Sequence, residues 1–164
     1  MSQKIKDIIA ASISVKQKIL QDEAMITTVN DCVTAIVAAF KNGNKVLFCG
    51  NGGSAADAQH LAAEFSGRFY LDRDALPAEA LHCNTSYMTA VANDYSYDVI
   101  YSRLVNGIGI KGDVLIGLST SGNSKNIVAA FEVAKQKGML TIGFTGDSGG
   151  KMKSISDYLL NVPS

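Results

Sequence analysis

Apolar residues near the start of the chain recur every three or four positions. One run has Ile5, Ile8, Ile9, Ile13, Ile19 and Leu20, and a second has Met25, Ile26, Val29, Val33, Ile36, Val37 and Phe40. This spacing predicts two amphipathic helices within residues 1–43, the second with Gly43 as its C-cap. The apolar stripes are long for a small domain, so we expect one helix to pack against another subunit, with ordinary core packing as the alternative.

Beyond Gly43 the pattern changes to short apolar runs, and helical patterns separate most of them. The runs cover residues 45–49, 78–83, 113–119, 140–145 and 158–162. Strands that alternate with helices are typical of βαβ crossovers and of a parallel sheet covered on both faces. The sequence therefore predicts an α/β fold, a flavodoxin-like three-layer αβα sandwich with a five-stranded parallel sheet, formed as one domain over residues 1–164.

Composition narrows the class of protein. The chain has 164 residues, 47% of them hydrophobic, which lets one domain bury a core without disulfides. Its 15 basic and 15 acidic residues balance and no basic run occurs, which argues against a nucleic-acid partner. Neither a signal peptide nor an uninterrupted apolar stretch of about 18 residues is visible, so we expect a cytoplasmic protein without a membrane span. Cys32, Cys49 and Cys83 lack a CxxC spacing and are expected to be buried thiols.

Loops rich in glycine or hydroxyl groups follow the predicted strands: GNGGS (50–54), NTS (84–86), STSGNS (119–124) and GDSGG (146–150). In a parallel sheet these loops gather at the carboxyl edge, where ligands bind. STSGNS brings four hydroxyl groups and a glycine to the start of a helix, a combination that can cradle a phosphate. The alternative is a hydroxyl-rich turn in which Ser124 is only an N-cap.

The loop after the first strand does not fit a dinucleotide site, because it lacks the GxGxxG spacing and no acidic residue ends the second strand. Ser54 and Asp57 resemble a capping box, which would mark the start of the next helix. His60 and Glu64 lie one helical turn apart, a spacing that permits a shared metal or an acid–base pair; an exposed salt bridge is the alternative. We expect His82, at the end of a strand, to be structural.

Three segments carry a family resemblance: CGNGGSAADAQHLAAEFSGRF, VANDYSYDVIYSR and GDVLIGLSTSGNSKN. They closely resemble the bacterial phosphoheptose isomerases of the sugar-isomerase (SIS) domain superfamily, and the similarity covers nearly the whole chain. The resemblance implies conversion of sedoheptulose 7-phosphate into D-glycero-D-manno-heptose 7-phosphate, toward ADP-heptose and lipopolysaccharide. It also implies a cytoplasmic homotetramer that uses zinc.

The same resemblance implies roles for individual residues. His60 and Glu64 match two zinc ligands and form the expected catalytic pair, with Glu64 as the base that also contacts substrate. The other substrate contacts implied are those to the sugar, from Asn51, Gly52, Gly53, Ser54, Asn93 and Asp94, and those to the phosphate, from Ser119, Thr120, Ser121 and Ser124.

One feature of the family is missing from the sequence. The family continues past the position of Ser164 into a helix with a Gln and a His that complete the metal site, so we expect a C-terminal helix to be lacking. The chain is then either a partial one or not an active isomerase as it stands. The competing interpretation is a non-catalytic SIS module that senses phosphosugars or binds proteins, as in the replication-initiator-associating type; the presence of Glu64 favours the enzyme.

Overall fold

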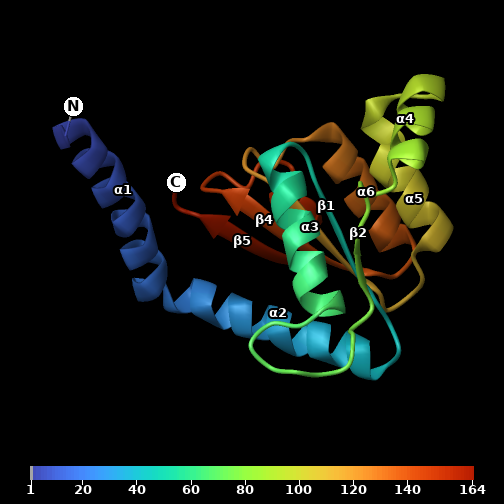
Figure 1. Ribbon diagram of the computed structural model, residues 1–164, viewed down its shortest axis with the longest axis horizontal. Coiled ribbons are helices and arrows are strands. Elements are labelled where there is room, and N and C mark those ends of the chain that lie inside the picture. The colour runs from blue at the N-terminus through green and yellow to red at the C-terminus, as the bar shows by residue number, and fades with distance from the viewer. Residues whose placement is uncertain (1) are drawn as a thin grey trace.

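The computed structural model describes residues 2–164. The chain begins with two long helices, α1 (Ser2–Gln21) and α2 (Glu23–Lys41), as the apolar spacing predicts. Between them the Asp22 carboxylate accepts a hydrogen bond of 2.9 Å from the Met25 N–H and caps α2. α1 extends away from the rest of the molecule and buries none of its residues (Figure 1). Gly43, with φ of 77°, follows the C-cap residue Asn42.

The remaining elements alternate strands with helices. In chain order they are β1 (Val46–Gly50), α3 (Gly53–Ser66), β2 (Ala78–Ala80), α4 (Thr85–Asp94), a 3-10 turn η1 (Tyr97–Val99), α5 (Ile100–Ile108), β3 (Val114–Ser119), α6 (Lys125–Gln136), β4 (Leu140–Gly146), α7 (Met152–Ile155) and β5 (Tyr158–Val162). All strand pairs are parallel, in the order β2-β1-β3-β4-β5. The predicted flavodoxin-like sheet is therefore confirmed. The second strand is shorter than predicted, because a turn at Ala80, closed by the Cys83 N–H, ends it.

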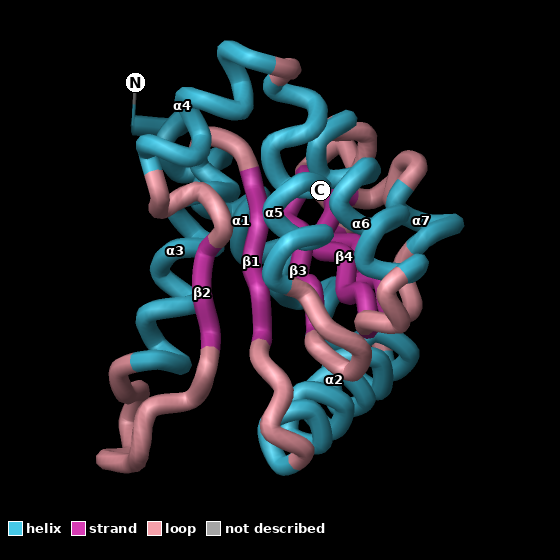
Figure 2. The backbone as a smooth tube through the Cα atoms, turned by 90° about the vertical axis from the view of Figure 1, so that its right-hand side faces the viewer, coloured by secondary structure: helices cyan, strands magenta, loops and turns pink. Residues whose placement is uncertain are grey.

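Helices cover both faces of the sheet (Figure 2). β1 is buried along its whole length, and its side chains alternate between the faces. Phe48 packs with Ala58 of α3 in the cluster on one face, and Leu47 packs with Phe131 of α6 in the cluster on the other. Cys32 and Cys49 are buried as expected, whereas Cys83 is exposed because it lies in the turn after β2. Burial raises the pKa of the Cys49 thiol.

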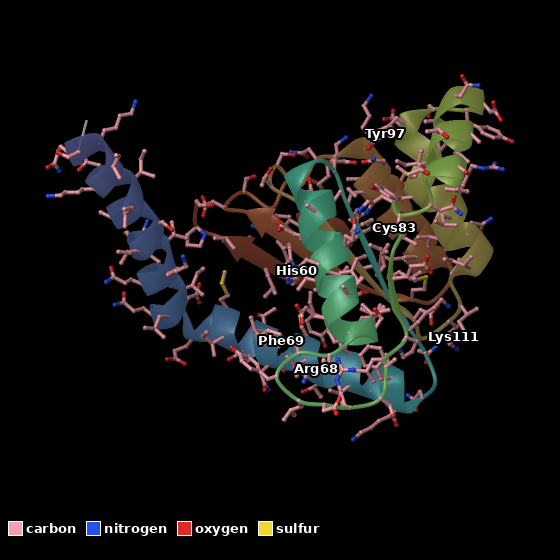
Figure 3. The ribbon with its side chains drawn as sticks, viewed as in Figure 1. His60, Arg68, Phe69, Cys83, Tyr97 and Lys111 are labelled. Carbon is pink, nitrogen blue, oxygen red and sulfur yellow. The ribbon has the colours of Figure 1, made fainter. Side chains whose placement is uncertain are left out.

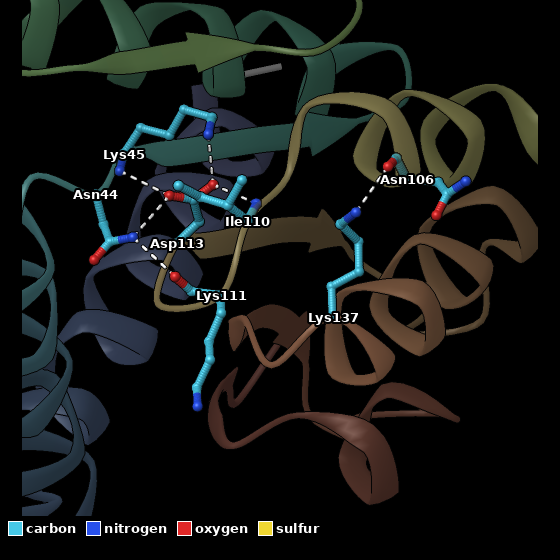
Figure 4. Close-up of polar contacts among 7 residues, drawn as sticks. All are labelled: Asn44, Lys45, Asn106, Ile110, Lys111, Asp113 and Lys137. Atoms are coloured by element: carbon cyan, nitrogen blue, oxygen red, sulfur yellow. Dashed lines mark hydrogen bonds and ion pairs between the residues drawn. The ribbon is translucent and has the colours of Figure 1, made fainter.

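An ion pair with a buried carboxylate lies at the amino edge of the sheet (Figure 4). The Asp113 side chain is fully buried and lies 2.6 Å from the Lys45 Nζ. Its carboxylate also accepts hydrogen bonds from the backbone N–H groups of Lys45 and Ile110 and from the amide of Asn44, at 3.1, 2.9 and 3.3 Å. Burial raises the pKa of this carboxyl, but the donors outweigh burial and hold the pKa below its ordinary value.

The N-terminal helices present a large uncovered apolar face. Its exposed residues on α1 and α2 are Ile5, Ile8, Ile9, Ile13, Leu20, Ile26, Val29, Val33 and Val37. Among residues 2–164, α2 is also the one helix long and apolar enough to cross a membrane, with a mean hydropathy of 1.3 and 11% of its most apolar window buried. The sequence analysis expected no membrane span because the chain has no continuous apolar stretch of the required length. In α2, polar residues interrupt the apolar ones. Packing within the chain leaves this face without a partner in the part that the structure describes.

Candidate active site

The hydroxyl-rich loop connects the carboxyl end of β3 to the first turn of α6. Ser124 occupies the N-cap position of α6, yet its side chain makes no capping hydrogen bond. Its Oγ lies instead 2.9 Å from the Oγ of Ser119. Within residues 2–164, the N–H groups of Ser121, Ser124 and Lys125 have no hydrogen-bond acceptor. The loop thus offers hydroxyl groups, free N–H groups and a helix N-terminus, all suited to an anion.

The segment that connects β4 to α7 contacts the hydroxyl-rich loop and holds it in place. Gly122 has φ of 63°, and a side chain there would collide with the carbonyl of Gly149. The Gly122 carbonyl accepts a hydrogen bond of 3.0 Å from the Met152 N–H, and the Asn123 amide oxygen accepts one of 3.0 Å from the Lys151 N–H. The hydroxyl-rich loop of residues 119–124, called the anion loop below, is therefore held by contacts that do not depend on a ligand.

The loop after β1 starts α3 differently from the predicted capping box. Gly52 is the N-cap residue, with φ of 56°, and no side chain caps the helix. Its carbonyl accepts hydrogen bonds from the N–H groups of Ala55 and Ala56, at 3.1 and 3.2 Å. The Ser54–Asp57 prediction is therefore wrong, because a backbone turn that glycine permits begins the helix. Both side chains are left free to face a cavity.

Three adjoining cavities run along α3. The first, about 310 Å³, is lined by Ser54, Asp57, Ser119, Thr120 and residues at the ends of β4 and β5. The second, also about 310 Å³, shares Asp57 with the first and includes His60. The third, about 450 Å³, contains both His60 and Glu64 among mainly apolar side chains. The hydroxyl loop and the His60–Glu64 pair therefore lie along one side of α3, at opposite ends of this row.

His60 and Glu64 form a close pair on α3, on which Figure 3 labels His60. The His60 Nε2 lies 3.0 Å from the Glu64 Oε1, and the side chains are 75% and 32% exposed. The nearby Arg73 guanidinium donates hydrogen bonds to the backbone carbonyls of Glu64 and Phe65, both at 2.9 Å, and so ties the following loop to the end of α3. Among residues 2–164, no third His, Cys, Asp or Glu joins this pair in a metal-binding group.

Other expected substrate contacts lie outside these cavities. Asn93 and Asp94 are exposed at the end of α4, where the Asn93 amide donates a hydrogen bond of 3.0 Å to the Asp94 carboxylate. Neither they nor Ser121 and Ser124 line any of the three cavities. The His82 ring is partly buried, which lowers its pKa, and its Nδ1 has no hydrogen-bond partner within residues 2–164.

Two polar residues that the sequence interpretation left without a role contact the site. The buried Asn126 and the exposed Tyr97 both form hydrogen bonds to the side chain of Asn51. Tyr97 lies at the carboxyl edge of the sheet (Figure 3). No local feature distinguishes Asn126, because a polar residue next to Lys125 at the start of a helix is ordinary. The tertiary pairing itself leaves no local pattern.

Known proteins are similar to this chain in sequence and in fold. A family model for the SIS domain matches residues 7–146. A phosphoheptose isomerase of Aneurinibacillus thermoaerophilus is 49% identical over 164 residues, which are 100% of this chain and 83% of the relative. One of Clostridium acetobutylicum is 55% identical over 156 residues, 95% of this chain and 80% of the relative. The structure of phosphoheptose isomerase GmhA from Neisseria gonorrhoeae has a TM-score of 0.92 and 40% identity, covering 99% of this chain and 86% of that one.

Proposed function

This chain belongs to the phosphoheptose isomerase family of SIS-domain proteins, and from that premise we propose that it interconverts sedoheptulose 7-phosphate and D-glycero-D-manno-heptose 7-phosphate. The observation that carries the proposal is the anion loop at the N-terminus of α6, joined by cavities along α3 to a carboxylate and an imidazole. The substrate class follows from that pairing of an anion site with an acid–base group. We further propose that the product feeds ADP-heptose and lipopolysaccharide synthesis in the cytoplasm.

The phosphate would be bound by Ser119, Thr120, Ser121 and Ser124. Free N–H groups at the start of α6 and the positive end of its helix dipole favour a dianion there without a lysine. Because the neighbouring loop already holds Gly122 and Asn123 in place, little ordering would accompany binding. Phosphate binding at a point remote from the reacting carbons then supplies positioning for the sugar.

The reaction moves a carbonyl from C2 to C1. The Glu64 carboxylate would remove a proton from C1 of the ketose, giving an enediolate with its charge on O2. Transfer of the O1 proton to O2 and return of the proton from Glu64 to C2 would then form the aldose. The His60 imidazole, 3.0 Å from Glu64, would orient that carboxylate. Asn51, Gly52, Gly53, Ser54, Asn93 and Asp94 are proposed contacts to the sugar.

Zinc is part of the proposal. The His60 Nε2 and the Glu64 carboxylate are suitable zinc donors at suitable spacing, but they are only two, and zinc sites in proteins normally have three or four protein ligands. Bound zinc would polarise the carbonyl oxygen of the sugar. We therefore expect the donors supplied by residues 2–164 alone to bind zinc weakly.

We also propose that the chain assembles into a tetramer through the apolar face of α1 and α2. Nine exposed Ile, Leu and Val side chains on these helices form a surface that isolated soluble chains rarely expose. Covering this face with a second copy would remove it from water and account for the apolar character of α2. Light scattering at micromolar concentration should give an oligomer, and a monodisperse monomer would contradict this assembly.

The function is tested by incubating the protein with sedoheptulose 7-phosphate and zinc and measuring the aldose formed. Conversion should be reduced about 100-fold to 10,000-fold in Glu64→Gln, because the variant lacks the proton-accepting carboxylate. Glu132→Gln, an exposed position on α6, is the matched control and should leave the rate unchanged. Binding of the sugar phosphate without any conversion, with zinc present and with the C-terminal helix of the family joined to the chain, would favour the sensing module instead.

A further inference from the structure

A reciprocal pair of amides connects the two loops of the site. Asn126 lies in the first turn of α6 and is 3% exposed. Its Nδ2 donates a hydrogen bond of 2.9 Å to the Oδ1 of Asn51, and the Asn51 Nδ2 donates one of 2.9 Å to the Oδ1 of Asn126. Because Asn51 follows β1 directly, this pair fixes the loop after β1 against the helix that begins at the anion loop.

Tyr97 adds a third hydrogen bond to the same side chain. Its hydroxyl group donates to the Asn51 Oδ1 at 3.2 Å, although the residue is 52% exposed. An amide oxygen has two lone pairs, so Asn126 and Tyr97 together fill both. Of the two N–H bonds of the Asn51 amide, one points to Asn126 and the other has no acceptor within residues 2–164. Asn51 can then offer a ligand a hydrogen-bond donor but no side-chain acceptor.

The loop after β1 depends on these contacts more than the anion loop does. The anion loop has its own support from Lys151 and Met152. On the β1 side, the Tyr101 hydroxyl donates to the Gly50 carbonyl at 2.5 Å and holds the backbone just before Asn51. The direction of the Asn51 amide, in contrast, is set by Asn126 and Tyr97.

We infer that Asn126 and Tyr97 are positioning residues that fix Asn51 as a hydrogen-bond donor toward the sugar, at a set distance from the phosphate. The inference rests on the proposed isomerase function, which supplies the sugar phosphate as ligand. Asn126 is buried with both its polar groups occupied, so it acts through Asn51 and does not touch the substrate. The geometry favours a substrate that places an acceptor oxygen opposite Asn51.

The test compares sugar phosphate with inorganic phosphate. In Asn126→Ala the kcat/KM for sedoheptulose 7-phosphate should fall about 10-fold to 100-fold, since small misplacements of binding groups have effects of this size. In Tyr97→Phe the fall should be about threefold, the effect of one lost hydrogen bond. The Kd of inorganic phosphate, measured by calorimetry, should stay within about twofold in both, because the anion loop keeps its own support.

A double-mutant cycle separates positioning from general stability. If Asn126 acts through Asn51, adding Asn126→Ala to Asn51→Ala should change kcat/KM by less than about twofold. Additive losses in the double variant, or equal losses of sugar phosphate and inorganic phosphate binding, would overturn the inference. Should Asn126→Ala fail to fold, Tyr97→Phe answers the question alone, because an exposed hydroxyl group is not needed for folding.

Two matched controls complete the experiment. Tyr95→Phe alters a neighbouring exposed tyrosine whose hydroxyl group has no hydrogen bond within residues 2–164, and it should change nothing. Asn44→Ala removes a structural amide at the opposite edge of the sheet; it should lower the melting temperature but keep kcat/KM. A wild-type protein that neither binds nor converts the sugar phosphate contradicts the proposed function, whereas an active wild type with unaffected variants contradicts this inference alone.

Discussion

The two edges of the sheet differ in whether their polar groups already have hydrogen-bond partners. At the amino edge, one fully buried carboxylate, Asp113, accepts hydrogen bonds from Asn44, Lys45 and Ile110 and leaves nothing open to solvent. At the carboxyl edge, Ser121 and Ser124 lie beside N–H groups that have no acceptor within residues 2–164. Polar groups that are hydrogen-bonded within the protein stabilise the fold, and those without a partner are available to a ligand.

This difference predicts that stability and binding separate between the edges. A change at the amino edge should alter the free energy of unfolding but not the affinity for phosphate. A change at the carboxyl edge should do the reverse, because the anion loop is backed by a second loop whose contacts would remain. Each variant is therefore measured for both properties.

The largest expected effect is on stability, from Asp113→Ala. Removing the carboxylate leaves the Lys45 Nζ and the backbone N–H groups of Lys45 and Ile110 without this acceptor, and leaving such donors unsatisfied costs about 3 kcal/mol in total. Urea unfolding should show this loss, while calorimetry gives an unchanged phosphate affinity. Asp147→Ala, an exposed aspartate in the loop after β4, is the control and should be neutral. A large fall in phosphate affinity in Asp113→Ala would contradict the expected separation of stability at one edge from phosphate binding at the other.

A smaller effect, on binding, is expected from Ser121→Ala combined with Ser124→Ala. Two hydroxyl donors to a charged ligand are lost, together about 2 kcal/mol or roughly 30-fold in Kd. Phosphate affinity should fall by this factor and the urea midpoint should barely move. Ser154→Ala, on α7, is the control and should bind normally. Unchanged phosphate affinity in the double variant would show that phosphate does not bind at this loop.

The smallest effect is a change in the pH dependence of stability. The folded pKa of Asp113 is lowered because its donors outweigh its burial, so the unfolded chain takes up the proton first as pH falls. The stability it contributes is fully present above the ordinary carboxyl pKa of 3.8 and is lost as pH falls through the lowered value. Asp113→Ala should therefore lose less stability on acidification than the wild type. Asp157, whose pKa is lowered too, should keep some acid dependence in both.

Local patterns were enough to predict the sheet and the place of the hydroxyl-rich loop at the start of a helix. Short apolar runs that alternate with helical patterns predict parallel strands. The hydroxyl groups of the anion loop are close together in the sequence, so their clustering needed no knowledge of distant contacts. The start of α3 was mispredicted at Ser54, because Gly52 permits a backbone turn that competes with side-chain capping. Composition alone does not reveal which of the two wins.

The pairing within the site could not be predicted. Asn51 and Asn126 are 75 residues apart, and their contact depends on how two crossovers place β1 beside β3. Tyr97 reaches the same amide from a third segment, the η1 turn. Contacts of this kind arise from tertiary packing, and each residue by itself has the surroundings of an ordinary loop or helix.

Exchange of the C1 proton with solvent tests the central claim most directly, because the claim is that Glu64 removes this proton from a sugar phosphate held at the carboxyl edge. Sedoheptulose 7-phosphate is incubated with protein and zinc in deuterated water, and loss of the C1 proton signal is followed by NMR. Wild-type protein should exchange the proton, and Glu64→Gln should slow exchange at least about 100-fold while still binding the sugar phosphate. Exchange at the wild-type rate in Glu64→Gln would contradict the account.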